Sequence, residues 1–193
     1  MRKADISRKT KETAISLRLN LDGKGVCRAK TGVGFLDHML DLLARHGGLD
    51  LTVTAKGDVH VDDHHLVEDV GIVLGQALKK ALGKKEGIAR YGWAVVPMDE
   101  ALVMCAVDLG GRPYLAYGLE LPAKRVKGFD TELIEEFVRA VVNAAGMNLH
   151  LRQLDGRNTH HIIEAAFKAF ARALGQAVAP SGKGGVPSTK GVL

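Results

Sequence analysis

The chain reads DDHHLVED at residues 62–69 and NTHHIIEA at residues 158–165. Each segment contains two adjacent histidines and a glutamate four positions after the first of them. Chance rarely produces this combination twice in one chain, and the two copies lie in corresponding places along the sequence. The pattern therefore indicates an internal duplication, which decides how the rest of the sequence is interpreted.

Two further alignments support the duplication. Laying KETAISLRLNLDGKG over DEALVMCAVDLGGRP places Glu12 on Glu100 without a gap. A second alignment, anchored on glycines that follow two predicted helices, places His38 on Glu136. Three anchors in the same order favour a chain built from two related halves.

The hydrophobic pattern predicts an α+β fold of two tandem repeats, residues 1–87 and residues 88–193, packed as a pseudo-symmetric pair. Each repeat is expected to form a small, mostly antiparallel sheet backed by helices. Alternating apolar residues predict strands, and apolar residues three and four apart predict helices. In the first repeat the strands are expected at 11–21 and 49–55, and the helices at 35–46 and 62–82. In the second repeat the strands are expected at 93–108 and 147–153, and the helices at 130–145 and 158–177.

Local signals predict turns and helix starts. Asp22 and Gly23 form a turn dipeptide, which predicts a hairpin whose returning arm is 26–30. Side chains that accept a hydrogen bond from the first turn mark helix starts. On this basis the N-caps of the last two helices are predicted at Asp130 or Thr131 and at Asn158 or Thr159.

The composition is that of a globular protein. The chain has 193 residues, 46% of them hydrophobic and 25% charged, which excludes disorder and a coiled coil. No apolar run is long enough to span a membrane, and the basic N-terminus lacks the apolar core of a secretory signal. The chain contains only Cys27 and Cys105, so we expect a cytoplasmic protein in a reducing environment. The net charge of +5 suits anionic partners such as nucleic acids or phosphorylated metabolites.

The repeated pattern has the chemistry of a metal site. Residues four apart lie on one face of a helix, so His64 and Glu68 can hold one ion, and so can His160 and Glu164. Adjacent residues point about 100° apart, so each second histidine is expected to serve the other ion. The geometry thus predicts two sites, with His65 and His161 as the exchanged ligands and His38 and Glu136 as candidates to complete the two sets. Imidazole and carboxylate without thiolate favour manganese, iron, nickel or zinc.

Other features support more than one interpretation. His60 has no counterpart in the second repeat and is expected to be structural or exposed. His150 falls in an alternating strand and is expected to pack rather than to bind metal. The C-terminal segment PSGKGGVPSTKGVL is typical of a disordered tail, but the groups of Ser188, Thr189 and Lys190 also suit a flexible phosphate clamp.

Five segments together resemble the imidazoleglycerol-phosphate dehydratase family of histidine biosynthesis, in its monofunctional form. They are FLDHMLDLLARHG, GDVHVDDHHLVEDVGIVLG, MDEALVMCAVDLGGRPYL, RNTHHIIEAAFKAFARAL and PSTKGVL. The resemblance covers nearly the whole chain. It implies a hydro-lyase that converts D-erythro-imidazole glycerol phosphate into imidazole acetol phosphate, and repeats of the ribosomal S5 domain 2-like type. It also implies two Mn²⁺ per active site and trimers that assemble into 24 subunits, with active sites shared between subunits.

Carried over position by position, the resemblance implies two sets of site residues. The metal ligands fall on His38, His64, His65, Glu68, Glu136, His160, His161 and Glu164. The phosphate contacts fall on His46, Arg90, Arg112, Lys168, Ser188 and Lys190. Position 136 is a glutamate where some relatives have histidine, and either side chain can bind manganese.

The implied reaction removes a proton from a carbon that is not acidic by itself. Metal bound to the imidazole ring would stabilise an imidazolate, and the ring could bridge two ions through its two nitrogens. Glu12 is the candidate acid and base, with its repeat partner Glu100 and the neighbouring Asp99 as alternatives.

Three other functions remain as alternatives. A metal-dependent hydrolase would use paired ions to activate water, and an assay for phosphate or acyl release distinguishes it. A nucleic-acid binder should carry basic stripes with interleaved aromatic residues, which this sequence lacks. A structural or storage shell would assemble with metal but show no turnover. The sequence favours the dehydratase, and no nucleic-acid or membrane partner is expected.

Overall fold

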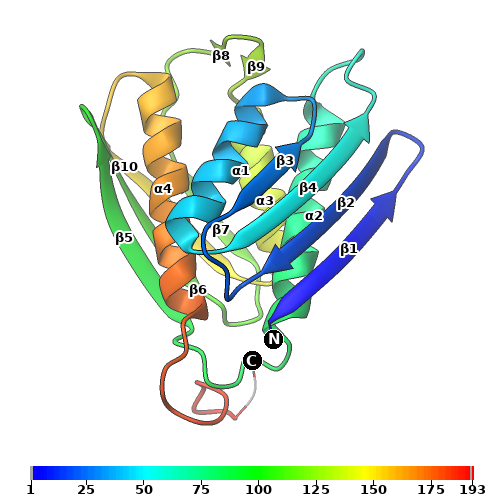
Figure 1. The fold of residues 1–193 in the computed structure, drawn as a ribbon. Coiled ribbons are helices and arrows are strands. Elements are labelled where there is room, and N and C mark those ends of the chain that lie inside the picture. Colours follow the sequence, from blue (N-terminus) through cyan, green and yellow to red (C-terminus); the bar gives the residue numbers. More distant parts are fainter. Residues whose placement is uncertain (1, 192) are drawn as a thin grey trace.

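The computed structural model describes residues 2–191 and 193. Its two four-stranded sheets enclose a layer of four helices (Figure 1). The first half contains α1 (Gly34–Gly47) and α2 (His64–Leu82), and the second contains α3 (Leu133–Ala145) and α4 (Thr159–Val178). Between the halves, α1 packs on α4 and α2 packs on α3. Each sheet therefore covers one side of the helical layer.

The two sheets have the same topology. The first sheet has the order β1-β2-β4-β3 and the second has the order β5-β6-β10-β7. In each, the first three strands are antiparallel and the fourth is parallel to its neighbour. The strands of the first sheet are β1 (Lys3–Lys9), β2 (Thr13–Asn20), β3 (Cys27–Lys30) and β4 (Asp50–Gly57). Those of the second are β5 (Tyr91–Met98), β6 (Ala101–Asp108), β7 (Tyr114–Gly118) and β10 (Asn148–Asp155). The predicted α+β fold of two similar repeats is confirmed.

The helices pack closely because small residues line their contacts. A side chain at Gly71 would lie 2.7 Å from the carbonyl oxygen of Phe137, and one at Gly75 would lie 2.6 Å from that of Val141. These two glycines of α2 thus let the backbone of α3 approach to a distance that a Cβ atom would prevent. Large apolar side chains such as Phe137 and Phe170 fill the rest of the layer, and both are almost completely buried.

The hairpin predicted after Asp22 is wrong. β3 runs parallel to β4 instead of returning along β2. Both edges of β2 are already occupied, by β1 on one side and β4 on the other, so β2 has no free edge for β3. Asp50, at the start of β4, accepts hydrogen bonds from the backbone N–H groups of Lys24 and Val26 at 2.8 and 3.1 Å. These bonds hold residues 24–26 across the start of β4, so that β3 pairs with the edge of β4 opposite β2.

Other boundaries also differ from the prediction. The single strand expected at 93–108 is the hairpin of β5 and β6, with Asp99 at a φ of 49° in its turn. α3 begins after Glu132, because Asp130 belongs to the short strand β9 (Phe129–Asp130), which pairs with β8 (Arg125–Val126). Strands β1, β7, β8 and β9 were not expected. The N-cap prediction at Asn158 is confirmed, since its side chain accepts from the backbone N–H groups of His160 and His161.

The bonds to Asp50 lead to a prediction about stability. Replacing Asp50 with alanine should cost about 1–2 kcal/mol at pH 7, because charge-assisted bonds to two backbone N–H groups are lost. Bonds from Lys24 and Val26 lower the pKa of Asp50 from 3.8, so their stabilisation is present above that pH and is lost as the pH falls. Thermal unfolding should show a Tm lower by about 2–8 °C at pH 7 and a smaller difference near pH 3. An equal difference at both pH values would contradict this explanation.

Candidate metal and substrate site

Three of the expected metal ligands meet where α1 packs against the first turns of α4. The Nε2 atom of His38 lies 2.8 Å from Oε1 of Glu164, and Nε2 of His160 lies 3.1 Å from the same oxygen. Donor atoms of all three residues lie within 4.8 Å of one another. In the described part of the chain, these three side chains form the group of His, Cys, Asp or Glu residues whose donor atoms lie close enough together to hold an ion.

The local sequence of α4 explains this arrangement. Asn158 begins the helix, and residues 160, 164 and 168 then follow at intervals of one turn on one face. Glu164 is buried, and Lys168 donates to its Oε2 atom at 2.7 Å. Burial raises the pKa of Glu164, but hydrogen bonds with Lys168, His38 and His160 outweigh this effect and hold the pKa at about 2. The carboxylate is therefore ionised at neutral pH and ready to bind a cation.

A pocket of about 500 Å³ opens beside this cluster. His38 and His160 line it together with Asp63, which directly precedes α2. Phe35 and Phe129 form an apolar wall, and the ring of Phe35 meets that of His160 edge-on at 5.4 Å. The pocket joins donor atoms to an apolar surface, a combination typical of sites for small molecules.

The second histidine of α4 faces a different carboxylate. The Nδ1 atom of His161 lies 2.7 Å from Oε2 of Glu100, and its Nε2 atom lies 3.7 Å from Oδ2 of Asp99. Glu100 also accepts from the backbone N–H groups of Arg157 and Asn158. The bond from His161, followed by the bond from Asn158, lowers the pKa of Glu100 to about 2, and Glu100 in turn raises the pKa of His161. Glu100 is therefore committed as an ionised acceptor.

In the first repeat the second histidine, His65, contacts an aspartate instead of a glutamate. The Nδ1 atom of His65 lies 3.0 Å from Oδ2 of Asp58, which raises the pKa of His65 and lowers that of Asp58. Glu12, the counterpart of Glu100, is exposed at the turn between β1 and β2. Sequence reasoning missed Asp58, which lies three residues beyond the strand predicted at 49–55 and directly follows the observed β4.

The remaining expected ligands lie outside the cluster. His64 and Glu68 are on α2 and Glu136 is on α3, and all three side chains are partly buried. These residues are not gathered with others into a group of three donors in the described part of the chain. Their role as ligands stays a prediction.

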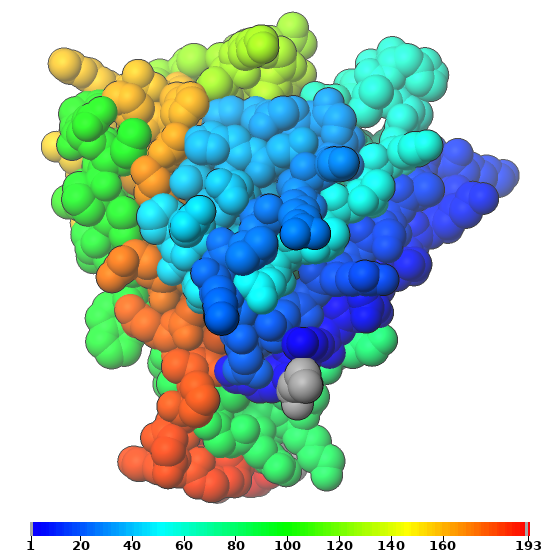
Figure 2. Space-filling view, viewed as in Figure 1, coloured from blue at the N-terminus to red at the C-terminus, as the bar shows by residue number. Residues whose placement is uncertain are grey.

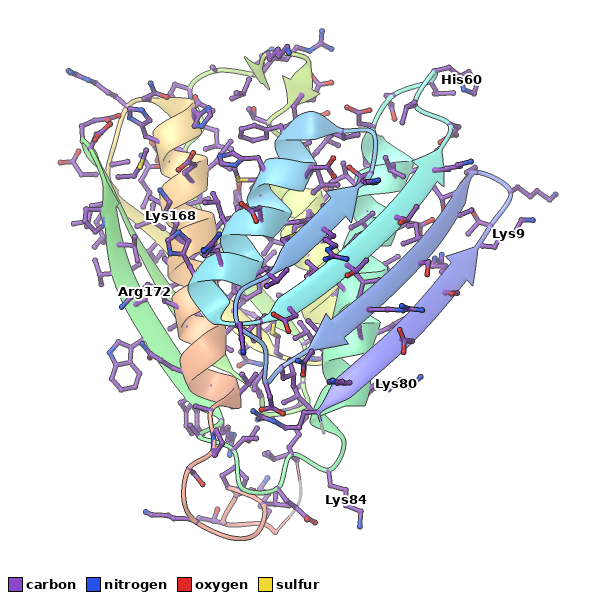
Figure 3. The ribbon with its side chains drawn as sticks, in the orientation of Figure 1. Lys9, His60, Lys80, Lys84, Lys168 and Arg172 are labelled. Atoms are coloured by element: carbon purple, nitrogen blue, oxygen red, sulfur yellow. The ribbon has the colours of Figure 1, made fainter. Side chains whose placement is uncertain are left out.

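The residues expected to bind phosphate form two groups. His46 lies near Lys168 and Arg172, the two residues labelled along α4 in Figure 3. Burial, and after it the positive charges of Lys168, Arg172 and Arg45, lowers the pKa of His46. His46 and Lys168 therefore belong to a positively charged surface beside the carboxylate of Glu164.

The second group lies at the other end of α4. The backbone N–H of Arg90 donates to the carbonyl oxygen of Ala177, near the end of that helix. The Arg90 side chain makes two bonds to Asp108, at 2.7 and 3.1 Å, and a third to the carbonyl oxygen of Pro187 in the tail. Arg112 is exposed, and Ser188 and Lys190 follow in the tail. Figure 2 shows the tail together with the segment after α2 at this end of the molecule.

The other two histidines behave as expected. His60 is exposed at the tip of the loop that follows β4 (Figure 3). His150 is partly buried on β10, and its ring centre lies 5.7 Å from that of Tyr114. Among the described residues, no helix has a stretch long and apolar enough to cross a membrane.

Comparison with known proteins adds independent information. The family model for imidazoleglycerol-phosphate dehydratase matches residues 31–174. The imidazoleglycerol-phosphate dehydratase of Desulforamulus reducens is 61% identical over 193 residues, covering 100% of this chain and 98% of the relative. That of Heliobacterium modesticaldum is also 61% identical, over 195 residues that cover both chains completely.

Solved structures show the same similarity. The crystal structure of imidazoleglycerol-phosphate dehydratase from Staphylococcus aureus has a TM-score of 0.84 at 44% identity and covers 92% of this chain and 99% of its own. The enzyme from Pyrococcus furiosus, crystallised in complex with (S)-C348, has a TM-score of 0.85 at 40% identity and covers 97% and 100%. The chain therefore belongs to the imidazoleglycerol-phosphate dehydratase family, the hydro-lyases that carry out the dehydration step of histidine biosynthesis.

Proposed function

We propose that the protein removes water from D-erythro-imidazole glycerol phosphate at an active site that contains two Mn²⁺ ions. The observation that carries this proposal is the group formed by His38, His160 and Glu164 beside the pocket. Two imidazole nitrogens and an ionised carboxylate oxygen are donors that suit manganese. The residues present thus fit the implied metal.

The other ligands of the metal set are those expected from the duplicated pattern. His64, His65, Glu68, Glu136 and His161 would complete the two ion sites together with the group already gathered. When bound, divalent ions would stabilise negative charge on the imidazole ring of the substrate, as an imidazolate. Lys168 and the histidines keep Glu164 ionised, and Glu100 and Asp58 orient His161 and His65.

Glu12 is the proposed group that moves the proton. Dehydration takes a proton from one carbon and hydroxide from the carbon beside the ring, and the resulting enol becomes the ketone product. Glu100 already accepts three hydrogen bonds, whereas Glu12 is exposed. An accessible carboxylate can accept a proton and return it, so the contacts favour Glu12 over Glu100. Asp99 is exposed as well and lies farther from His161, so it remains an alternative.

The proposed phosphate contacts lie in two groups along α4, and this arrangement bears on the proposed assembly. His46 and Lys168 lie beside the metal group, while Arg90, Arg112, Ser188 and Lys190 belong to the opposite end of α4. Lys168 and Ala177, whose carbonyl oxygen accepts from Arg90, are nine residues apart on that helix, or about 14 Å along its axis. Since Arg90 is also held by Asp108 and Pro187, this separation supports active sites shared between subunits, in the proposed trimers of a 24-subunit assembly. Light scattering of the metal-loaded protein measures the number of subunits.

A direct assay tests the proposed reaction. The purified, manganese-loaded protein should convert imidazole glycerol phosphate into imidazole acetol phosphate without releasing inorganic phosphate. Product formation can be followed by the appearance of the ketone, and a phosphate assay on the same sample detects hydrolysis. Phosphate release without ketone formation would favour the hydrolase alternative and reject the dehydration.

We also propose a cytoplasmic location. The structure contains free thiols at Cys27 and Cys105, and Cys105 is completely buried in the core. Unpaired buried cysteines are typical of proteins that fold in a reducing compartment. Fractionation of the native cells would test this location.

A further inference from the structure

A buried polar network connects the turn between β1 and β2 to helix α2. Asp69 of α2 is only 7% exposed, and it is surrounded by core residues. Its Oδ1 atom accepts from Nε of Arg8 at 2.9 Å, and its Oδ2 atom accepts from the hydroxyl of Thr13 at 2.5 Å. Burying a carboxylate is costly unless it is fully paired, so this arrangement requires an explanation.

The hydrogen bonds of the network run in one direction, towards Asp69. Thr13 uses its single hydroxyl hydrogen for the carboxylate, so in the 3.2 Å contact between the two hydroxyls it is Thr10 that donates. The oxygen of Thr10 then accepts from the backbone N–H groups of Glu12 and Thr13, at 3.1 and 2.9 Å. The chain of bonds therefore starts at the backbone of Glu12 and ends at a buried anion on α2.

The second repeat has the same hairpin without this network. The repeat alignment places Val96, Met98, Ala101 and Ala165 where the first repeat has Arg8, Thr10, Thr13 and Asp69. The hairpin of β5 and β6 nevertheless forms, with a regular antiparallel register. A hairpin of this shape can thus form without the polar residues, so formation of the turn alone does not account for their presence in the first repeat.

The two repeats also fix their equivalent glutamates differently. Glu100 is held through its own carboxylate, which accepts from His161, Arg157 and Asn158. In the first repeat the backbone N–H of Glu12 donates to the hydroxyl oxygen of Thr10 instead, and the exposed carboxylate of Glu12 is left available. Bonds made by the backbone hold the residue in place and leave both carboxylate oxygens free to exchange a proton.

We propose that Asp69, acting through Thr13 and Thr10, is a positioning residue for the carboxylate of Glu12. The inference rests on the proposed role of Glu12 as the group that moves the proton. Arg8 balances the charge of Asp69, and the network holds the turn at a fixed place relative to α2, the helix that carries His64, His65 and Glu68. Without it, the turn would still form, but the carboxylate of Glu12 would sample positions away from the substrate.

Thr13→Val is the variant that tests the network, since it keeps the shape of the side chain and removes the hydroxyl. We expect kcat to fall at least about 10-fold and KM to change less than about twofold, because misplacing a reacting group affects turnover rather than substrate binding. Thr13→Ser keeps the hydroxyl and should recover kcat to within about threefold of the wild type. Ile15→Val is the matched control: it removes one buried methyl group from the same strand and should lower the Tm but not kcat.

A double-mutant cycle separates this inference from the proposed function. Adding Thr13→Val to Glu12→Gln should cause no further loss, because the network would act only through Glu12. If Glu12→Gln itself keeps normal turnover, the proposed role of Glu12 is wrong. If Glu12→Gln is inactive while Thr13→Val keeps full kcat, Glu12 retains its role and the positioning network is rejected.

A measurement that does not depend on turnover completes the test. Hydrogen exchange followed by mass spectrometry should show faster exchange in a peptide covering residues 9–14 of Thr13→Val than in Ile15→Val. The expected difference arises because the N–H groups of Glu12 and Thr13 lose an ordered acceptor. Equal exchange in the two variants, combined with a lower kcat for Thr13→Val, would show that the hydroxyl does not act by ordering the turn.

Discussion

Replacing Glu164 with alanine is expected to lower kcat/KM by at least about 10³-fold, because a bound metal ion contributes several kcal/mol to charge stabilisation. Glu164 lies at the centre of the gathered group and contacts both His38 and His160. Without its carboxylate, two histidines and the ammonium group of Lys168 would face one another with no negative charge between them. The variant should therefore bind less than the normal amount of manganese.

The measurement combines metal analysis of the purified chain with the dehydration assay. Glu135→Ala is the matched control, because Glu135 forms the same i,i+4 carboxylate–cation pair with Arg139 on α3 but lies outside the group. It should keep its metal and its activity. Chelation of the wild-type protein should reproduce the loss, and added Mn²⁺ should restore activity in the wild type only. A Glu164 variant with full metal content and normal turnover would contradict the assignment.

Glu12→Gln is expected to lower kcat by about 10² to 10⁴-fold, the range in which a positioned acid or base contributes. The substitution keeps the size of the side chain and removes its ability to carry a proton. Since Glu12 has no bond to the gathered histidines, metal content should stay unchanged. Steady-state kinetics at saturating substrate, together with metal analysis, measure both quantities.

Glu100→Gln is the informative comparison, because it alters the equivalent residue of the second repeat. Glu100 supports His161 by a direct hydrogen bond, so its loss should weaken metal binding by about 10 to 100-fold. Excess Mn²⁺ should then restore much of the activity of Glu100→Gln and none of that of Glu12→Gln. The opposite pattern, with rescue of Glu12→Gln, would assign the proton transfer to Glu100 or to Asp99.

The sequence predicted those parts of the fold that depend on local periodicity and on the repeat. Strands β2 and β4 and all four helices follow from the spacing of apolar residues, and Asn158 is the expected N-cap of α4. Aligning the repeats singled out His38, which a scan for neighbouring ligands in the sequence would miss. The structure places it against Glu164, a residue far along the chain.

Features that depend on distant partners could not be predicted. The short strand β3 follows a turn signal, but its partner is decided by which edge of the sheet is free and by the bonds to Asp50. The sequence also does not show which carboxylate the second histidine of each pair contacts. His161 contacts Glu100, whereas His65 contacts Asp58. Nor does the sequence show that Arg90 holds the tail, through Pro187, near the C-terminal end of α4.

The helical layer between the two sheets has a consequence for the integrity of the molecule. Each half contributes one wall and two helices, and the inner side of those helices is covered only by the other half (Figure 1). A nick in the segment between α2 and β5 should therefore leave two fragments that remain associated through an apolar seam. Either fragment produced alone would expose that seam to water, and it would aggregate or pair with a copy of itself.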